Sequence, residues 1–110
     1  MATKIPKPRS KLETKFLFLW DKVIKGPRLE EEVVFIPGRR FRCDFKLDNI
    51  LIEIEGGHWM SKSRHTSGAG FEGDCEKYFL AFLAGFRVVR LTSNMITEEN
   101  LRRILDFYKS

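Results

Sequence analysis

Two residues, Asp48 and Asn49, separate two stretches of the chain in which apolar side chains recur at every second position. Both residue types tolerate the positive φ angles of a two-residue hairpin turn, so the pattern predicts an antiparallel hairpin that reverses here. The turn also sets the pairing of the strands. Leu47 must face Ile50, and each step back along one strand matches one step forward along the other.

This register continues with Lys46 opposite Leu51, Phe45 opposite Ile52, and Asp44 opposite Glu53. Because side chains alternate between the faces of a sheet, one face of the hairpin is wholly apolar and is expected to be core. Its members are Phe41, Cys43, Phe45, Leu47, Ile50, Ile52 and Ile54. On the other face Asp44 and Glu53 are neighbours, with Cβ atoms expected ~5 Å apart. Carboxylates this close repel each other, so their charge needs compensation.

A divalent cation would compensate this charge, because hard oxygen ligands suit Mg²⁺ or Mn²⁺, and either ion takes further ligands from water or a substrate phosphate. Such an ion can polarise a phosphate and activate a water for in-line attack. The simpler alternative is that both carboxylates point to solvent and are neutralised by Lys46, or by Arg42, which the register places opposite Glu55. The pairing alone leaves both interpretations open.

Further helices and strands are expected on both sides of the hairpin. Ser10 and Glu13 fit the S-x-x-E capping box of a first helix, whose apolar residues recur at helical spacing. Strands are expected over 31–36, 39–47, 50–55 and 86–91. A helix over 74–84, closed by Gly85, and a last helix capped by Thr97 complete an αβββαβα order. The helix over 74–84 is apolar at Cys75, Phe79, Phe82 and Leu83.

The length of 110 residues allows one compact domain, over 10–110, preceded by a basic arm over 1–9. No apolar run approaches the ~18 residues that span a bilayer, so a cytoplasmic protein with no membrane partner is expected. Twenty basic against fifteen acidic residues give a net charge of +5, which favours a polyanionic partner. Cys43 and Cys75 are too few for a disulfide framework and are expected to be buried thiols.

A long loop over 56–73 gathers side chains that suit nucleic-acid binding. His58 and His65 can act as acids or bind phosphate near neutral pH, and Trp59 can stack on a base. Lys62 and Arg64 add positive charge between them. We therefore expect this loop to contact DNA.

A structural zinc site is an alternative use of the two loop histidines, with Cys43 and Cys75 as the other ligands. Their spacing is not that of a zinc finger, and Cys43 belongs to the expected core face of the hairpin. Both points count against zinc.

Asp44, the strand that ends in Glu53-Ile54-Glu55, and the helix that carries Asp74 and Lys77 together resemble the PD-(D/E)XK nuclease superfamily. The segments IEIEGGHW, SRHTSGAGF and GFRVVRLT are most similar to small phage and bacterial proteins related to the VRR-NUC and very-short-patch-repair-like nucleases. The resemblance covers roughly residues 10–92. It implies an α/β fold with a restriction-endonuclease-like αβββαβ core, a mixed four-stranded sheet flanked by helices, and an extra C-terminal helix.

By this resemblance Asp44 and Glu53 are catalytic metal ligands, and the backbone carbonyl of Ile54 supplies another ligand. Glu13 is a further candidate ligand, because many such nucleases carry a first-helix glutamate that approaches the metal. It also serves the capping box, and both roles can hold.

One position departs from the superfamily signature, because Glu55 stands where the signature usually has lysine. A carboxylate cannot replace an ammonium that orients the water and stabilises negative charge. Either Glu55 binds the metal or acts as base, or Lys77 reaches in from the following helix as a catalytic cation. The simpler alternative for Lys77 is an ion pair with Asp74 one helical turn away.

The sequence thus predicts a divalent-metal-dependent deoxyribonuclease, an endonuclease that uses Mg²⁺ or Mn²⁺. The chain has almost no room for a separate sequence-reading module, so we expect selectivity for branched, nicked or flap DNA. A homodimer would bring two sites to two strands. The alternative is a catalytically inactive domain of nuclease fold that binds nucleic acid or a partner protein, with the missing lysine as a sign of decay.

Overall fold

The computed structural model describes residues 9–56 and 68–110, so most of the predicted basic arm lies outside it. The described elements, in chain order, are α1 (Lys11–Phe18), η1 (Leu19–Val23), β1 (Glu30–Val34), β2 (Arg42–Leu47), β3 (Ile50–Glu55), α3 (Gly68–Leu83), β4 (Arg87–Thr92), η2 (Ser93–Met95) and α4 (Glu98–Lys109). Over these residues the order of α-helices and strands is the predicted αβββαβα. No helix in the described ranges is long and apolar enough to cross a membrane.

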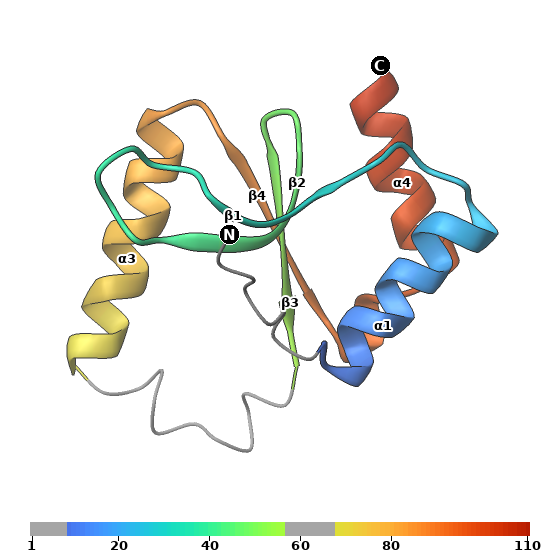
Figure 1. Cartoon of the computed structure of the whole chain (residues 1–110), viewed down its shortest axis with the longest axis horizontal. Helices are drawn as coiled ribbons and strands as arrows, with labels where there is room; N and C mark the ends of the chain where they lie inside the picture. Colours follow the sequence, from blue (N-terminus) through green and yellow to red (C-terminus); the bar gives the residue numbers. More distant parts are fainter. Residues whose placement is uncertain (1–8, 57–67) are drawn as a thin grey trace, which may run out of the picture.

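The strands form one mixed four-stranded sheet in the order β1-β2-β3-β4. β2 pairs antiparallel with β1 and with β3, whereas β3 and β4 run parallel. Figure 1 shows α1 and α4 on one side of the sheet and α3 on the other. The predicted α/β architecture with a mixed four-stranded sheet is therefore confirmed.

The first helix begins at the predicted capping box. The Ser10 hydroxyl accepts a hydrogen bond from the Glu13 backbone N–H at 3.1 Å, and the Glu13 carboxylate accepts one from the Ser10 N–H at 3.0 Å. After the helix, Gly26 passes close to the Trp20 indole, and a Cβ at Gly26 would lie only 2.5 Å from that ring. This close approach lets the chain turn back toward β1 while Trp20 stays fully buried.

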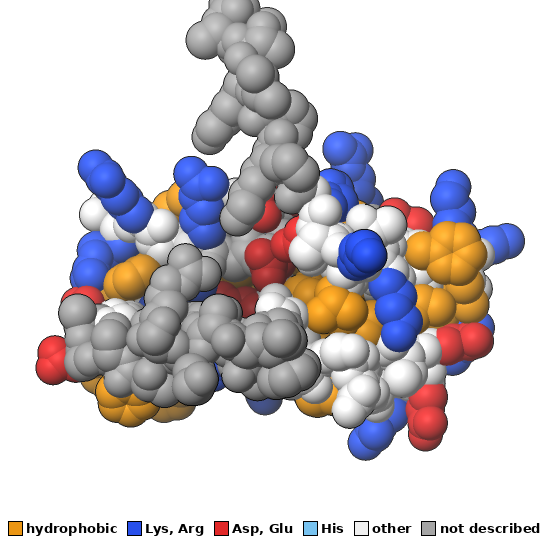
Figure 2. All heavy atoms as spheres, turned by 90° about the horizontal axis from the view of Figure 1, so that it is seen from below, with side chains coloured by type: hydrophobic (Ala, Val, Ile, Leu, Met, Phe, Trp, Pro, Cys, Tyr) orange, Lys and Arg blue, Asp and Glu red, His pale blue; other side chains and the backbone are white. Residues whose placement is uncertain are grey.

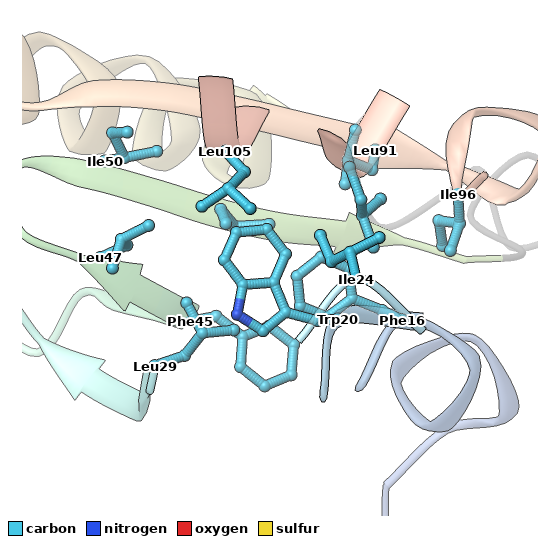
Figure 3. Close-up of a cluster of buried hydrophobic side chains, with 12 residues drawn as sticks. Phe16, Trp20, Ile24, Leu29, Phe45, Leu47, Ile50, Leu91, Ile96 and Leu105 are labelled. Atoms are coloured by element: carbon cyan, nitrogen blue, oxygen red, sulfur yellow. The ribbon is translucent and has the colours of Figure 1, made fainter. Parts of the chain in front are cut away.

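The larger core fills the space between the sheet and the helices α1 and α4. Its centre is aromatic: the Phe16 ring stacks on Trp20 and on Phe45 of β2 (Figure 3). The buried members are Phe16, Trp20, Ile24, Leu29, Phe45, Leu47, Ile50, Ile52, Leu91, Ile96, Leu101 and Leu105. A smaller cluster of Phe35, Cys43, Leu51 and Ala81 lies toward α3.

The predicted hairpin register is confirmed near the turn. Leu47 pairs with Ile50, Lys46 with Leu51 and Phe45 with Ile52. Asp48 has φ +54° in the turn, the conformation for which Asp and Asn are suited. The strands β1 and β2 are both shorter than predicted, because the connection between them extends from residue 35 to residue 41.

The single apolar face predicted for the hairpin is wrong. Phe45 and Leu47 belong to the larger core, but Cys43 belongs to the smaller cluster and Phe41 packs against it. The physical reason is a bend in β2 (Figure 1), which pairs with β1 from Arg42 to Lys46 but with β3 only from Phe45 to Leu47. Strict alternation of side chains holds only while a strand keeps its direction.

Helix α3 begins at Gly68, inside the stretch predicted as a loop over 56–73, and ends before Gly85, which has the φ of +88° expected at this position. Its fully buried side chain is Ala81. The prediction that Cys75 is buried is wrong, because Cys75 lies on the outward side of the helix and is exposed. The apolar positions Phe79, Phe82 and Leu83 are exposed with it. Cys43, by contrast, is buried as predicted.

The aromatic centre of the larger core predicts that two phenylalanines of α1 contribute very differently to the free energy of unfolding. Phe16→Ala removes a fully buried ring and should lower the free energy of unfolding by about 3–5 kcal/mol. Phe18→Ala, in the same helix but 58% exposed, should change it by less than about 0.5 kcal/mol. Urea unfolding followed by circular dichroism measures both values, and equal losses would contradict this core.

Candidate metal centre

The predicted metal ligands lie where β2 bends away from β3. The last β2–β3 pair is Phe45 with Ile52. Beyond it, the Asp44 side chain replaces a backbone partner: its Oδ2 accepts a hydrogen bond from the Ile54 backbone N–H at 2.8 Å. Asp44 is half-buried there, and the β2–β3 pairing stops one residue short of the direct Asp44–Glu53 pair expected from the hairpin.

Three carboxylates from three elements meet at this bend. Glu13 of α1, Glu32 of β1 and Asp44 of β2 each offer an oxygen, and these oxygens lie within 4.8 Å of one another. The β1–β2 register brings Glu32 opposite Asp44, because Glu31 pairs with Phe45 and Val33 with Cys43. Glu32 has φ +53°, which is unusual for a non-glycine residue inside a strand. The backbone thus adopts a costly conformation at the residue that completes the cluster.

Crowding and burial raise the pKa of Asp44 from its ordinary 3.8 to about 6. Burial of the carboxylate is the largest cause, and the charges of Glu13, Glu53 and Glu32 add to it. The hydrogen bond from the Ile54 N–H acts in the opposite direction and favours the charged form. Asp44 is therefore a carboxylate that the protein alone does not neutralise.

Glu53 has a different environment, although it lies close enough to affect Asp44. It is only 6% exposed, and both of its oxygens are engaged by neighbouring residues of α3. The Lys77 ammonium forms an ion pair with Oε2, and the Tyr78 hydroxyl donates a hydrogen bond to Oε1. Burial and this carboxylate raise the pKa of Tyr78, so its hydroxyl stays a donor.

Glu55 is held from the neighbouring strand. Its Oε2 accepts a hydrogen bond from Arg90 Nε of β4 at 3.0 Å. The Arg90 guanidinium also lies over the Tyr78 ring, 5.0 Å from its centroid. Arg90 thus contacts both Glu55 and Tyr78, and Tyr78 binds Glu53, so one connected group of side chains fixes both glutamates.

Several predicted residues meet here, and two others were missed. Glu13 and Asp44 share one cluster, and Lys77 contacts Glu53. Glu32 and Tyr78 were missed because nothing local marks them. The position of Glu32 follows only from the β1–β2 register, and that of Tyr78 only from the packing of α3 on the sheet. A ligand role for the Ile54 carbonyl, like one for Glu53, stays a prediction.

The alternative that both hairpin carboxylates point to solvent is wrong, because Glu53 is buried and Asp44 half-buried. Of the two cations named in it, Lys46 binds outside the acidic cluster, whereas Arg42 lies near one of its members, Glu32. Lys46 pairs with Glu30 at 3.2 Å, and Arg42 lies 3.8 Å from Glu32.

The loop residues predicted to bind DNA lie outside the described residues. They are His58, Trp59, Lys62, Arg64 and His65. Their roles stay predictions, as does the zinc alternative that used the two histidines. Of the two cysteines proposed as zinc ligands in that alternative, Cys43 is buried and Cys75 is exposed.

The surface around the centre carries both signs of charge. Figure 2 views the molecule from the end where β3 finishes and α1 begins. Acidic side chains lie near the middle of this face, and Lys and Arg side chains surround them. Such a surface can attract a polyanion to its rim while the acidic middle holds cations.

Comparison of the chain with models of protein families, with curated proteins and with solved structures found no match.

The raised pKa of Asp44 predicts a pH-dependent stability. The folded protein keeps this proton to a higher pH than the unfolded chain, so the stabilisation is present below pH 3.8 and is lost as the pH rises through about 6. Asp44→Asn retains an oxygen for the Ile54 N–H but has no charge. It should be more stable than wild type above pH 6, with the difference disappearing toward pH 3.8.

Denaturant unfolding over a pH series measures this difference. Asp48→Asn, in the exposed hairpin turn, is the matched control and should show no such trend. A difference between Asp44→Asn and wild type that stays constant with pH would contradict the raised pKa.

Removal of the Tyr78 hydroxyl should destabilise the protein. Tyr78→Phe leaves Glu53 Oε1 without this donor in a buried position, at a cost of about 1–3 kcal/mol. Tyr108→Phe on α4 should cost less, because Tyr108 packs against the apolar core. Thermal unfolding compares the variants, and an unchanged stability of Tyr78→Phe would argue against the bond to Glu53.

Proposed function

We propose that this chain is a divalent-metal-dependent nuclease that hydrolyses phosphodiester bonds of DNA. The observation that carries the proposal is the convergence of Glu13, Glu32 and Asp44 within 4.8 Å, next to a buried Glu53 that is paired with Lys77. We also propose that the αβββαβ part of the fold is a restriction-endonuclease-like core, in keeping with the resemblance carried by Asp44 and Glu53.

The donor set fits a hard divalent cation. Three carboxylates offer only oxygen ligands, which Mg²⁺ and Mn²⁺ prefer. Oxygens bound to one Mg²⁺ lie roughly 3–4 Å apart, so a cluster within 4.8 Å needs only small side-chain rotations to close. The raised pKa of Asp44 points the same way: burial is its largest cause, and a bound cation would favour the charged carboxylate and relieve the added repulsion from the acidic neighbours.

Glu13, Glu32 and Asp44 would hold the ion, and Glu53 lies beside them. When bound, the ion supplies Lewis acidity toward a phosphate oxygen and lowers the pKa of a coordinated water. The capping-box role of Glu13 is compatible with this, because its Oε1 bond to Ser10 fixes the carboxylate at the start of α1. If the Lys77 ammonium left Glu53 for another partner, the Glu53 carboxylate would be free to bind the ion.

Lys77 supplies the cation that the superfamily signature places at the position of Glu55. It sits on α3, with its ammonium on the Glu53 carboxylate, so a positive charge is present beside the acidic cluster. An ammonium there can stabilise negative charge that develops on a phosphate oxygen. Tyr78 positions Glu53 for this arrangement, and Arg90 binds Glu55.

The net charge of the chain favours DNA as the substrate. The net charge of +5 and the Lys and Arg side chains around the centre in Figure 2 suit a polyanion. Residues 9–56 and 68–110 form one sheet with its helices and no separate sequence-reading module, so we propose selectivity for branched, nicked or flap DNA. Cleavage of one short sequence in every structural context would contradict that selectivity.

Metal binding and cleavage test the proposal together. Isothermal titration should show Mn²⁺ binding to wild type, and Glu32→Gln should weaken it by more than the roughly 10–100-fold that loss of an outer-shell partner costs. Glu31→Gln is the matched control, because Glu31 neighbours Glu32 on β1 but pairs with Arg9. Its affinity should stay at the wild-type value.

Cleavage is measured on supercoiled plasmid and on branched DNA with Mg²⁺, Mn²⁺ or EDTA. Wild type should nick DNA only with metal, and Glu53→Ala and Lys77→Met should abolish nicking. Cleavage that persists in EDTA or in Glu32→Gln would overturn the assignment of the centre. Metal binding without cleavage would instead identify the catalytically inactive DNA-binding domain.

A further inference from the structure

We propose that the outward side of α3 is an interface through which two copies of this chain associate. A row of apolar side chains runs along this side with a spacing of four residues. The row consists of Phe71, Cys75, Phe79 and Leu83, with Phe82 beside it, and is called the α3 ridge below. Phe71, Phe79, Phe82 and Leu83 are 60%, 59%, 72% and 61% exposed, and Cys75 is exposed as well.

Within the described part of the chain the α3 ridge stays exposed, because the helix uses its other side to pack on the sheet. The 3.6-residue period of a helix places Lys77 and Ala81 about half a turn away from Phe79. Ala81 is fully buried in the smaller core cluster, and Lys77 binds Glu53. A helix that packs through its polar and small residues therefore leaves its apolar row in solvent, the reverse of ordinary amphipathic packing.

The exposed area is large for a chain of this size. A large aromatic side chain covers about 150–250 Å². With the exposed fractions above, the α3 ridge presents on the order of 500 Å² of apolar surface, the size that marks interaction sites on soluble proteins. Two such surfaces together bury roughly 1,000 Å², the lower bound for a specific protein interface. An interface of this size lies at the weak end of specific complexes, so a weak, concentration-dependent dimer is expected.

The spacing of the α3 ridge favours a second copy over an unrelated partner. A two-fold axis through its middle, between Cys75 and Phe79, brings Cys75 opposite Phe79 of the second copy. The same axis brings Phe71 opposite Leu83 of that copy. The row is therefore complementary to itself, as a two-fold interface requires. Rows spaced by four residues also pack into the grooves of an identical helix in the most common helix-packing geometry.

The proposal of this interface does not rest on the proposed nuclease activity, because the α3 ridge lies on the side of the helix opposite Lys77. Sedimentation velocity of the full chain over a range of concentrations tests it. Wild type should shift with concentration from 12.9 kDa toward twice that mass. Phe79→Glu and Leu83→Glu should remain monomeric, because each would place a charge inside the interface.

The matched control is Phe107→Glu, which alters a similarly exposed phenylalanine on α4. It should dimerise like wild type. Circular dichroism should show all three variants folded, since the substituted side chains are exposed. A wild type that stays monomeric at high micromolar concentration would overturn the proposal and leave the α3 ridge to a different partner. Dissociation caused only by Phe107→Glu would overturn it as well.

The two-fold arrangement is tested by a disulfide. Phe79→Cys places a thiol opposite Cys75 of the second copy, so mild oxidation should yield a covalent dimer. The double variant Phe79→Cys with Cys75→Ser should not, because residues at position 79 in the two copies lie away from each other along the helix. A non-covalent dimer that gives no disulfide with Phe79→Cys would contradict the arrangement proposed for the α3 ridge.

Discussion

The hydrogen bond from the Ile54 N–H to the Asp44 carboxylate is the interaction on which the rest of the structure depends. It satisfies a β3 donor with a side chain, so β2 can leave β3 without an unpaired buried amide. Once β2 has turned away, Cys43 faces α3 instead of α1, and the core divides into two clusters. The same turn brings Glu32 and Glu13 to Asp44. The bend of the sheet and the acidic cluster thus both depend on Asp44.

Two carboxylates near this bend differ in how their charge is compensated. Glu53 is buried, and Lys77 and Tyr78 engage both of its oxygens, as a buried charge requires. Asp44 receives one backbone N–H, and its pKa rises because the carboxylate is partly buried and because acidic neighbours lie close to it. A purely structural network would place a cation at Asp44 as well. The imbalance between these two sites is the physical argument for an external cation.

The parts that sequence predicts are those set by local chemistry. The Ser10–Glu13 capping box and the hairpin register depend on residues a few positions apart, and both are found. The bend at Asp44 was not predictable from alternation, because alternation assumes a straight strand. Glu32 follows only from the β1–β2 pairing, which spans a longer connection. The inward side of α3 depends on helix-to-sheet packing, for which the sequence carries no local sign.

Helix α3 connects the centre with the outer surface of the protein. Its inward residues Lys77 and Tyr78 hold Glu53, whereas Phe79 on its outward side is exposed. Among the side chains described in residues 70–83 of the helix, Ala81 is the fully buried one, so the apolar packing of this part on the sheet is slight. Association through the α3 ridge would add apolar contacts to the helix that carries the proposed catalytic cation. Its position over Glu53 would then depend on assembly as well as on the fold.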